Sequence, residues 1–573
     1  MLKLRSQEWF GRNDRQGYEH RGMMRALGLG DEAFSGKPII GLCSVWSELN
    51  PCDLGLKDLA ERARAGVIAA GGVPVLFPAP AIGEPLMRPS PMMYRNLVSM
   101  VVEETIRGNP LDGVVLLAGC DKSTPALLMG AFSVDIPAIM LSSGPRNSSR
   151  FKGDVIGGGT QIWRTEQAIA EGNWTQEDAA MSEAAMGASH GTCNTMGTAS
   201  TMAAIVETLG LALPNNTSLG STDARRATLA EQTGRRIVDA VLSDRKPSAF
   251  LTRTHFENAI RVVSALGGST NAVPHLLAMA GRAEIDLSLE DWERFGDGVP
   301  CLVDLLPAGR YLMQDFDDAG GLSVVIKSLL EKGLLDGSTP MIEGSTLADR
   351  VQHASCWNAE VIRTFDNPVS TQGGLKVLRG NLCPDGAVMK PSAASPDLMQ
   401  HRGRARVFDD IEAWKTIASD MNADIEATDI VVVRNSGPVG YPGMPEIGNV
   451  RIPDKLARQG VTDMVRLSDA RMSGTAFGTV ILHITPESAV GGPLGLVQDG
   501  DEIALDTEKG KLELLVDEAE LERRRQAIGD APSARAERGY ESLYQKYVKQ
   551  ADSGADFTFL EGRSGSAAPR DST

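Results

Sequence analysis

Short apolar segments alternate with amphipathic segments over roughly the first 370 residues. The segments that predict strands are residues 37–43, 73–77, 113–118 and 136–141. The segments that predict helices are residues 56–70, 96–107, 195–213 and 257–282. Strands separated by helical segments of about ten to fifteen residues are typical of βαβ units. The pattern therefore predicts an N-terminal α/β domain with a largely parallel sheet.

The pattern changes after about residue 375. Short strands are predicted at residues 374–378, 405–408, 430–433, 479–483 and 511–516, separated by Gly, Pro and Asp turns. This spacing favours a smaller, β-rich and barrel-like C-terminal domain. We expect domains over residues 1–375 and 376–562. The last residues, 563–573, are rich in Ser, Gly and Ala and predict a disordered tail.

Size and charge narrow the function classes. The 573 residues are too many for one core, and 57 basic against 74 acidic side chains give a net charge of −17. This balance argues against partners such as nucleic acid or an anionic membrane, and an anionic substrate would need a local cation such as a metal ion. No apolar run approaches the roughly 20 residues of a membrane span, and the first residues lack the apolar stretch of a signal peptide. We expect a cytoplasmic protein.

The chain has seven cysteines, an odd number that does not suggest a disulfide framework. Cys120 follows the predicted strand 113–118, while Cys52 and Cys193 each precede a predicted helix. Ligands gather at the carboxyl ends of parallel strands, and helix N-termini stabilise thiolates. Three thiolates from three loops suit an iron–sulfur cluster with one position not filled by cysteine, whereas a structural zinc site usually shows closely spaced pairs. The other cysteines are interpreted as structural: Cys43, Cys301, Cys356 and Cys383.

Carboxylates stand close to one of these cysteines in the sequence. Asp121 and Lys122 form either a surface ion pair or a site in which Asp121 is a hard oxygen ligand for Mg²⁺ and a buried Lys122 is converted to a metal-binding group. Glu84 and Glu446 are further candidate ligands. Glu446 lies in segment 440–449, whose Gly and Pro content is typical of functional loops.

Two further segments carry unusual small residues. Ser473, in segment 468–478, is a nucleophile, a base or a turn residue; it is not a hydrolase elbow, because Arg471 stands where the first glycine of G-x-S-x-G would be. The glycines at 157–159 follow no clear strand and lack G-x-G-x-x-G spacing, which argues against a dinucleotide site.

Taken together, these segments closely resemble the dihydroxy-acid and 6-phosphogluconate dehydratase family, from about residue 5 to residue 560. The matching segments are Pro51-Cys52, GCDKSTP at 119–125, GTCNTMGTAS at 191–200, GGSTN at 267–271 and DARMSG at 469–474. Within the family, segments 93–96, 193–202, 390–395 and 440–444 look most like sugar-acid dehydratases of the L-arabinonate type.

The resemblance implies two inorganic cofactors and a base. The implied assignments are a [2Fe–2S] cluster on Cys52, Cys120 and Cys193, Mg²⁺ on Glu84, Asp121, Glu446 and carbamylated Lys122, and Ser473 as the base. The family usually has Asn after the first cluster cysteine, where this chain has Asp53. An extra carboxylate there would alter the potential or stability of the cluster.

The expected reaction is loss of water from a sugar acid. Ser473 would act as an alkoxide, with a pKa lowered by a nearby cation, and would remove the C2 proton while the C3 hydroxyl leaves. The product is a 2-keto-3-deoxy acid, and no nicotinamide is needed because there is no net redox change. The alternatives are a branched-chain dihydroxy-acid dehydratase, a 6-phosphogluconate dehydratase, a non-catalytic iron–sulfur sensor and a nicotinamide oxidoreductase. The resemblance also suggests a homodimer or homotetramer.

Overall fold

The computed structural model describes residues 4–528, 536–565 and 567–571. The N-terminal domain is built on a four-stranded, entirely parallel sheet in the order β2-β1-β3-β4. Its strands are β1 Ile39–Ser44, β2 Val73–Pro78, β3 Gly113–Leu117 and β4 Ala138–Leu141. β1, β3 and β4 are buried along their whole length, as continuous apolar runs require when helices cover both faces. The prediction of a parallel α/β domain is confirmed.

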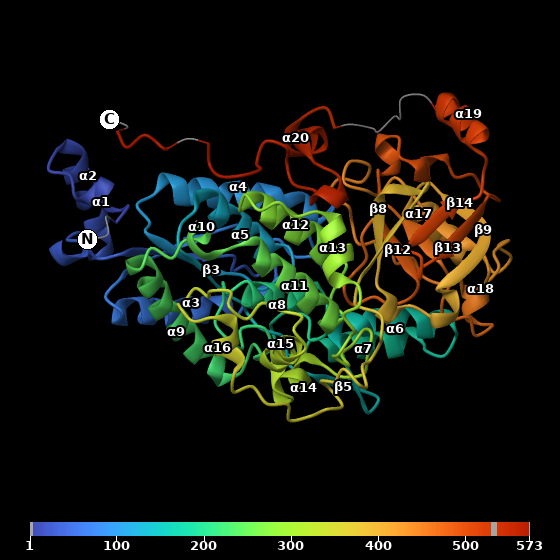
Figure 1. The fold of residues 1–573 in the computed structure, drawn as a ribbon, viewed down its shortest axis with the longest axis horizontal. Coiled ribbons are helices and arrows are strands. Elements are labelled where there is room, and N and C mark those ends of the chain that lie inside the picture. Colours follow the sequence, from blue (N-terminus) through green and yellow to red (C-terminus); the bar gives the residue numbers. More distant parts are fainter. Residues whose placement is uncertain (1–3, 529–535, 566, 572–573) are drawn as a thin grey trace.

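Helices cover the sheet on both sides. In Figure 1, α4 Pro91–Gly108 and α5 Ser123–Val134 lie on one side of β3, and α3 Leu56–Ala69 and α9 Ala224–Leu242 lie on the other. α3 and α9 pack unusually closely, because a Cβ at Gly66 would lie 1.9 Å from the Glu231 carbonyl oxygen and a Cβ at Gly234 would lie 2.0 Å from that of Ala63. These glycines set the distance between the two helices.

The prediction of one long helix over residues 257–282 is wrong. The segment is part of two helices, α11 Arg253–Leu266 and α12 Ala272–Arg282. Gly267 adopts a left-handed conformation with φ +59° and closes α11, which is the usual role of glycine just past a helix end. The apolar periodicity continues on both sides of the break and hides it. The helix predicted at 195–213 is also shorter in the structure, as α8 Thr198–Thr208.

The C-terminal domain is a closed eight-stranded barrel, seen at the right of Figure 1. Its order is β10-β11-β12-β8-β7-β14-β13-β9, with both parallel and antiparallel neighbours. The strands are β7 Lys376–Gly380, β8 Cys383–Met389, β9 Gln400–Phe408, β10 Ile430–Val433, β11 Arg466–Ser468, β12 Val480–Thr485, β13 Glu502–Asp506 and β14 Lys511–Leu514. The prediction of a β-rich, barrel-like domain is confirmed.

The remaining elements connect and flank these two units. A small hairpin is formed by β5 Ser149–Phe151 and β6 Asp154–Ile156. The other α-helices are α1 Gln7–Phe10, α2 Arg15–Met24, α6 Gly158–Ala170, α7 Gln176–Met186, α10 Pro247–Phe250, α13 Leu289–Gly296, α14 Met313–Asp318, α15 Gly321–Glu331, α16 Leu347–Val351, α17 Ile411–Ala418, α18 Asp454–Ala457, α19 Glu518–Ile528 and α20 Gly539–Tyr547. Across the described ranges, no helix is both long and apolar enough to cross a membrane.

The C-terminal segment returns to the N-terminal domain. Figure 1 shows the chain running from α20 along the N-terminal domain towards α1 and α2. The sequence predicts disorder at 563–573; residues 566, 572 and 573 lie outside the described residues, and several of the described ones make specific contacts. The backbone N–H of Ser564 donates to the Ser133 carbonyl at 2.8 Å, and the Arg570 guanidinium lies 4.1 Å from the Trp9 ring centroid and 2.8 Å from Glu8. A cation–π contact and an ion pair give this polar segment partners that its composition does not reveal.

Candidate active site

The loops that carry three cysteines meet at the carboxyl edge of the parallel sheet. Cys120 follows β3, and Cys52 lies in the short turn that precedes α3. The Cys193 loop joins them, because the backbone N–H of Gly191 donates to the Pro51 carbonyl at 3.4 Å. Cys52 and Cys120 are buried, and Cys193 is partly buried. The structure thus brings together the three cysteines that the sequence singles out.

The environment of these thiols disfavours their ionisation as long as they carry protons. The pKa of Cys120 lies well above its ordinary value, chiefly because of a hydrogen bond with Cys52 and secondly because the thiol is buried. Burial, followed by the charge of Cys52, raises the pKa of Cys193 to about 11. Neighbouring buried thiols of this kind gain most from a metal that replaces their protons.

Asp53 fastens the turn of Cys52 to the loop of Cys120. Its Oδ1 accepts the backbone N–H of Gly119 at 2.8 Å, and its Oδ2 accepts Asn50 Nδ2 at 2.7 Å. The side chain is fully buried, and burial raises its pKa to about 7. Glycine is required at 119, because a Cβ there would lie 1.7 Å from Ser143 Oγ.

The four candidate metal-binding residues also converge. Carboxylate oxygens of Glu84, Asp121 and Glu446 all lie within 4.8 Å of one another. Lys122 Nζ lies 2.8 Å from an oxygen of each. Glu84 precedes α4, Asp121 and Lys122 precede α5, and Glu446 comes from the loop after β10 in the barrel domain, so both domains build this cluster.

The charges within this cluster are strongly coupled. The pKa of Glu84 is raised to about 7, chiefly because the carboxyl group is buried and secondly because of the negative charge of Glu446. Burial and Arg471 oppose ionisation of Lys122, but the three carboxylates outweigh them and raise its pKa above the ordinary value. The surface ion-pair interpretation of Lys122 is wrong, because its side chain is fully buried among three carboxylates.

Two residues of this cluster were not predicted to have a role. Arg471 is fully buried; it donates to Glu446 Oε1 at 2.9 Å and to the Met444 carbonyl at 2.6 Å. Asn271 Nδ2 lies 2.6 Å from the same Glu446 oxygen. Both residues belong to unusual segments, GGSTN at 267–271 and DARMSG at 469–474, but only the fold shows what they contact.

Asn271 also links the carboxylates to the loop that carries Ser473. Its Nδ2 donates to the Met472 carbonyl at 3.1 Å. Ser473 Oγ lies 2.9 Å from Thr475 Oγ1 and accepts the backbone N–H of Thr475 at 3.3 Å. Ser473 is only partly buried, whereas Thr475 is buried. Ser473 is therefore held by two potential donors from one residue.

The remaining sequence candidates have no role in this chemistry by themselves. Gly157–Gly159 leads into α6 beside the site, where the backbone N–H of Gly158 donates to Asn194 Oδ1 at 3.0 Å. The four other cysteines are free; three are buried and one is exposed, namely Cys43, Cys301, Cys383 and, at the surface, Cys356.

Comparison with known proteins identifies the family. Residues 37–350 match the model for the dihydroxy-acid/6-phosphogluconate dehydratase N-terminal domain, and residues 360–555 match the model for the C-terminal domain. The chain is 50% identical to L-arabinonate dehydratase of Rhizobium leguminosarum bv. trifolii (strain WSM2304), over 100% of this chain and 98% of that protein. It is 51% identical to L-arabonate dehydratase of Azospirillum brasilense, over 99% and 98%, and 45% identical to 6-deoxy-6-sulfo-D-gluconate dehydratase of Pseudomonas putida, over 99% and 98%. The chain belongs to the dihydroxy-acid/6-phosphogluconate dehydratase family and is a hydro-lyase.

Proposed function

We propose that this hydro-lyase dehydrates an aldonate, specifically a pentonate such as L-arabinonate, to its 2-keto-3-deoxy acid. The observation that carries the proposal is the convergence of three cysteines, three carboxylates with Lys122, and the Ser473 loop at one edge of the sheet. The two relatives that are about half identical to the chain are L-arabinonate and L-arabonate dehydratases, which supports a pentonate substrate.

The residues fit the two cofactors that this family implies. The neighbouring thiols of Cys52, Cys120 and Cys193 suit a [2Fe–2S] cluster with one iron position left for substrate. The oxygens of Glu84, Asp121 and Glu446 suit Mg²⁺, to which a carbamylated Lys122 would add a further oxygen. With all three carboxylates ionised and Lys122 unmodified, Lys122 and Arg471 leave one negative charge uncompensated, which favours a bound cation. When bound, the two metals supply Lewis acidity at the substrate oxygens.

The side chains of the chain supply the proton transfer. Ser473 removes the proton from C2, which it can do only as an alkoxide, because a neutral hydroxyl is too weak a base. The hydroxyl and backbone N–H of Thr475 are placed to donate to that oxygen and stabilise its charge. Hydroxide leaves from C3, and the enol tautomerises to the keto acid without any oxidant. Lys122 and Arg471 are fully buried, whereas the side chains of Glu84, Asp121 and Glu446 are partly exposed.

The test is formation of 2-keto acid by anaerobically purified protein with Mg²⁺. L-Arabinonate, D-xylonate, D-gluconate and 2,3-dihydroxyisovalerate are compared at equal concentration. We expect the pentonates to exceed the branched acid in kcat/KM, and Ser473→Ala to abolish turnover while a serine control at the surface, Ser35→Ala, retains it. Preference for dihydroxyisovalerate would overturn the substrate assignment, and full activity of Ser473→Ala would overturn the base.

The proposal also covers the oligomeric state of the protein and its place in the cell. We expect a homodimer or homotetramer that acts in the cytoplasm, with no nucleic-acid or membrane partner. Light scattering coupled to gel filtration measures the mass of the assembly, and a 61.1 kDa species would contradict the oligomer.

A further inference from the structure

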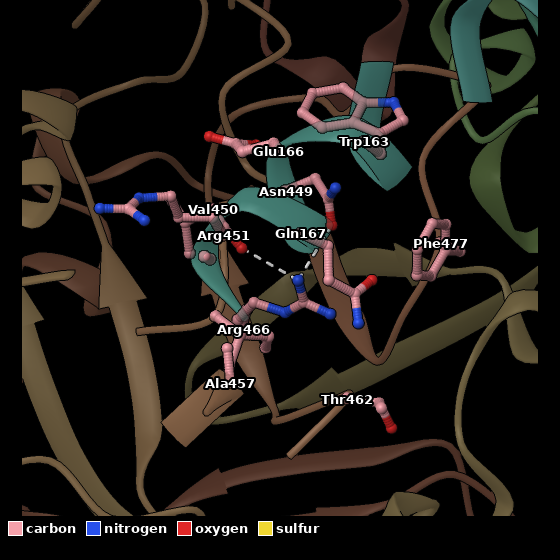
Figure 2. Close-up of a pocket in the computed structure, with 12 residues that line it drawn as sticks. Trp163, Glu166, Gln167, Asn449, Val450, Arg451, Ala457, Thr462, Arg466 and Phe477 are labelled. Carbon is pink, nitrogen blue, oxygen red and sulfur yellow. Dashed lines mark hydrogen bonds between the residues drawn. The ribbon is translucent and has the colours of Figure 1, made fainter. Parts of the chain in front are cut away.

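A tryptophan outside the predicted site lies behind Ser473. Trp163 is on α6 and lines a small cavity of about 50 Å³ between this helix, the barrel loop around Asn449 and the start of β11 at Arg466. Figure 2 shows the Trp163 indole at the edge of this cavity, with its ring nitrogen on the side away from Glu166. That nitrogen, Nε1, donates to Thr475 Oγ1 at 3.1 Å.

The α6 backbone is pressed against Thr475, so this contact is well defined. A Cβ at Gly159 would lie 2.4 Å from Thr475 Cγ2. Thr160, which lies one turn before Trp163 on α6, also contacts Thr475: its Oγ1 donates to the Thr475 carbonyl at 3.4 Å. The side chain and the backbone of Thr475 are therefore both held by α6.

The chemistry of the three groups fixes the direction of one hydrogen bond and, once Ser473 is ionised, of the other. An indole N–H can only donate, and a threonine hydroxyl has a single proton and two acceptor lone pairs. Thr475 Oγ1 thus accepts from Trp163, and its own proton remains available for Ser473 Oγ, 2.9 Å away. Once Ser473 is an alkoxide, donation from Thr475 to Ser473 is the only direction possible between these two oxygens. Donors to an anionic oxygen favour the ionised form.

We propose that Trp163 is a positioning residue for the proposed base, acting through Thr475 so that the threonine hydroxyl points its proton at Ser473 Oγ. The inference rests on the proposed function of Ser473. It adds a residue of α6 to the machinery, one that reaches the proposed base through Thr475. It also gives a role to the packing of the Ser473 loop against the glycine-rich start of α6.

The test is a double-mutant cycle of Trp163→Phe and Thr475→Val, measured on the holoenzyme with the best sugar acid. Loss of one neutral hydrogen bond predicts that Trp163→Phe lowers kcat about fivefold with little change in KM. The primary isotope effect with C2-deuterated substrate should rise, because proton abstraction then limits turnover more fully. In the Thr475→Val background, Trp163→Phe should have no further effect on kcat, since the tryptophan acts only through this hydroxyl.

Controls separate positioning from folding. Trp357→Phe, at a side chain that is 78% exposed, should match the parent protein in all readouts. If Trp163→Phe does not fold, replacing Trp163 with benzothienylalanine removes the N–H and keeps the ring shape. The inference would be overturned if Trp163→Phe lowered kcat equally in both backgrounds, or if it left the isotope effect unchanged. In either case, an inactive Ser473→Ala would still support Ser473 as the base. Full activity of Ser473→Ala would overturn both.

Discussion

Asp53 Oδ1 accepts the backbone N–H of Gly119 at 2.8 Å and so ties the turn of Cys52 to the loop of Cys120. Its second oxygen accepts Asn50 Nδ2, while Asn50 Oδ1 is buried and makes no hydrogen bond to the described residues. An asparagine at 53 could still accept the Gly119 N–H through its Oδ1, and its Nδ2 could donate to Asn50 Oδ1 once the Asn50 amide turns over. The geometry is therefore compatible with either residue, and the carboxylate adds charge beside the proposed cluster rather than a new contact.

This relationship predicts different outcomes for two variants of Asp53. Asp53→Asn should retain the cluster and raise its reduction potential, because a buried negative charge is removed. Asp53→Ala leaves the Gly119 N–H unpaired, at a cost of about 1–3 kcal/mol, and should shorten the lifetime of the cluster in air. Iron content, visible absorbance and a redox titration measure these effects. A full cluster of parental lifetime in Asp53→Ala would contradict the tie between the two loops.

Glu446 is the carboxylate that the barrel domain brings to Glu84 and Asp121. Glu446→Gln can still accept from Asn271 and Arg471 but loses the charge that a hard cation prefers. We expect the Mg²⁺ concentration for half-maximal activity to rise at least about tenfold, measured after chelation and re-addition. Glu343→Gln is the matched control, because Glu343 is a partly buried carboxylate paired with Arg350 at 2.6 Å outside the site. An unchanged Mg²⁺ requirement in Glu446→Gln would remove this residue from the metal site.

Arg471 holds the same carboxylate and the loop that carries it. A lysine cannot reproduce the separate bonds to Glu446 and to the Met444 carbonyl, because it offers one compact ammonium in place of a planar fork. Arg471→Lys should lower kcat/KM by more than about tenfold, the loss expected when a buried charge pair is disturbed by over about 1.4 kcal/mol. Arg466→Lys makes the same change at another buried arginine, which contacts Asp463 and should affect thermal stability without this loss of activity. Similar kinetic losses in both variants would show that the effect is a general one of burying lysine.

The sequence predicts the strands of the parallel sheet well, because each is a continuous apolar run flanked by turn residues. It also singles out Cys52, Cys120 and Cys193, since Cys120 follows a buried strand and the other two each precede a helix. The break at Gly267 is missed because the apolar period runs on through it. The positions of Arg471 and Asn271 could not be predicted, because their contacts depend on how the barrel docks on the α/β domain. Trp163 is missed for the same reason: its partner is more than 300 residues away in the chain.

Lys390 gives the last prediction, which concerns stability and its dependence on pH. It follows β8, is 2% exposed, and its Nζ makes no hydrogen bond to the described residues. Burial lowers its pKa to about 8 from 10.5. The unfolded chain therefore binds more protons between these two values, so this lysine opposes folding fully below pH 8, and its cost disappears as the pH rises towards 10.5. At about 1.4 kcal/mol per unit of pKa, the cost at pH 7 is about 3 kcal/mol.

Lys390→Met should raise the urea midpoint of unfolding at pH 7, and this gain should shrink at pH 10. Lys511→Met, at an exposed lysine, should show neither effect. A Lys390→Met protein that is less stable than the parent at pH 7, or a gain that is equal at both pH values, would show that Lys390 is not an unpaired buried cation.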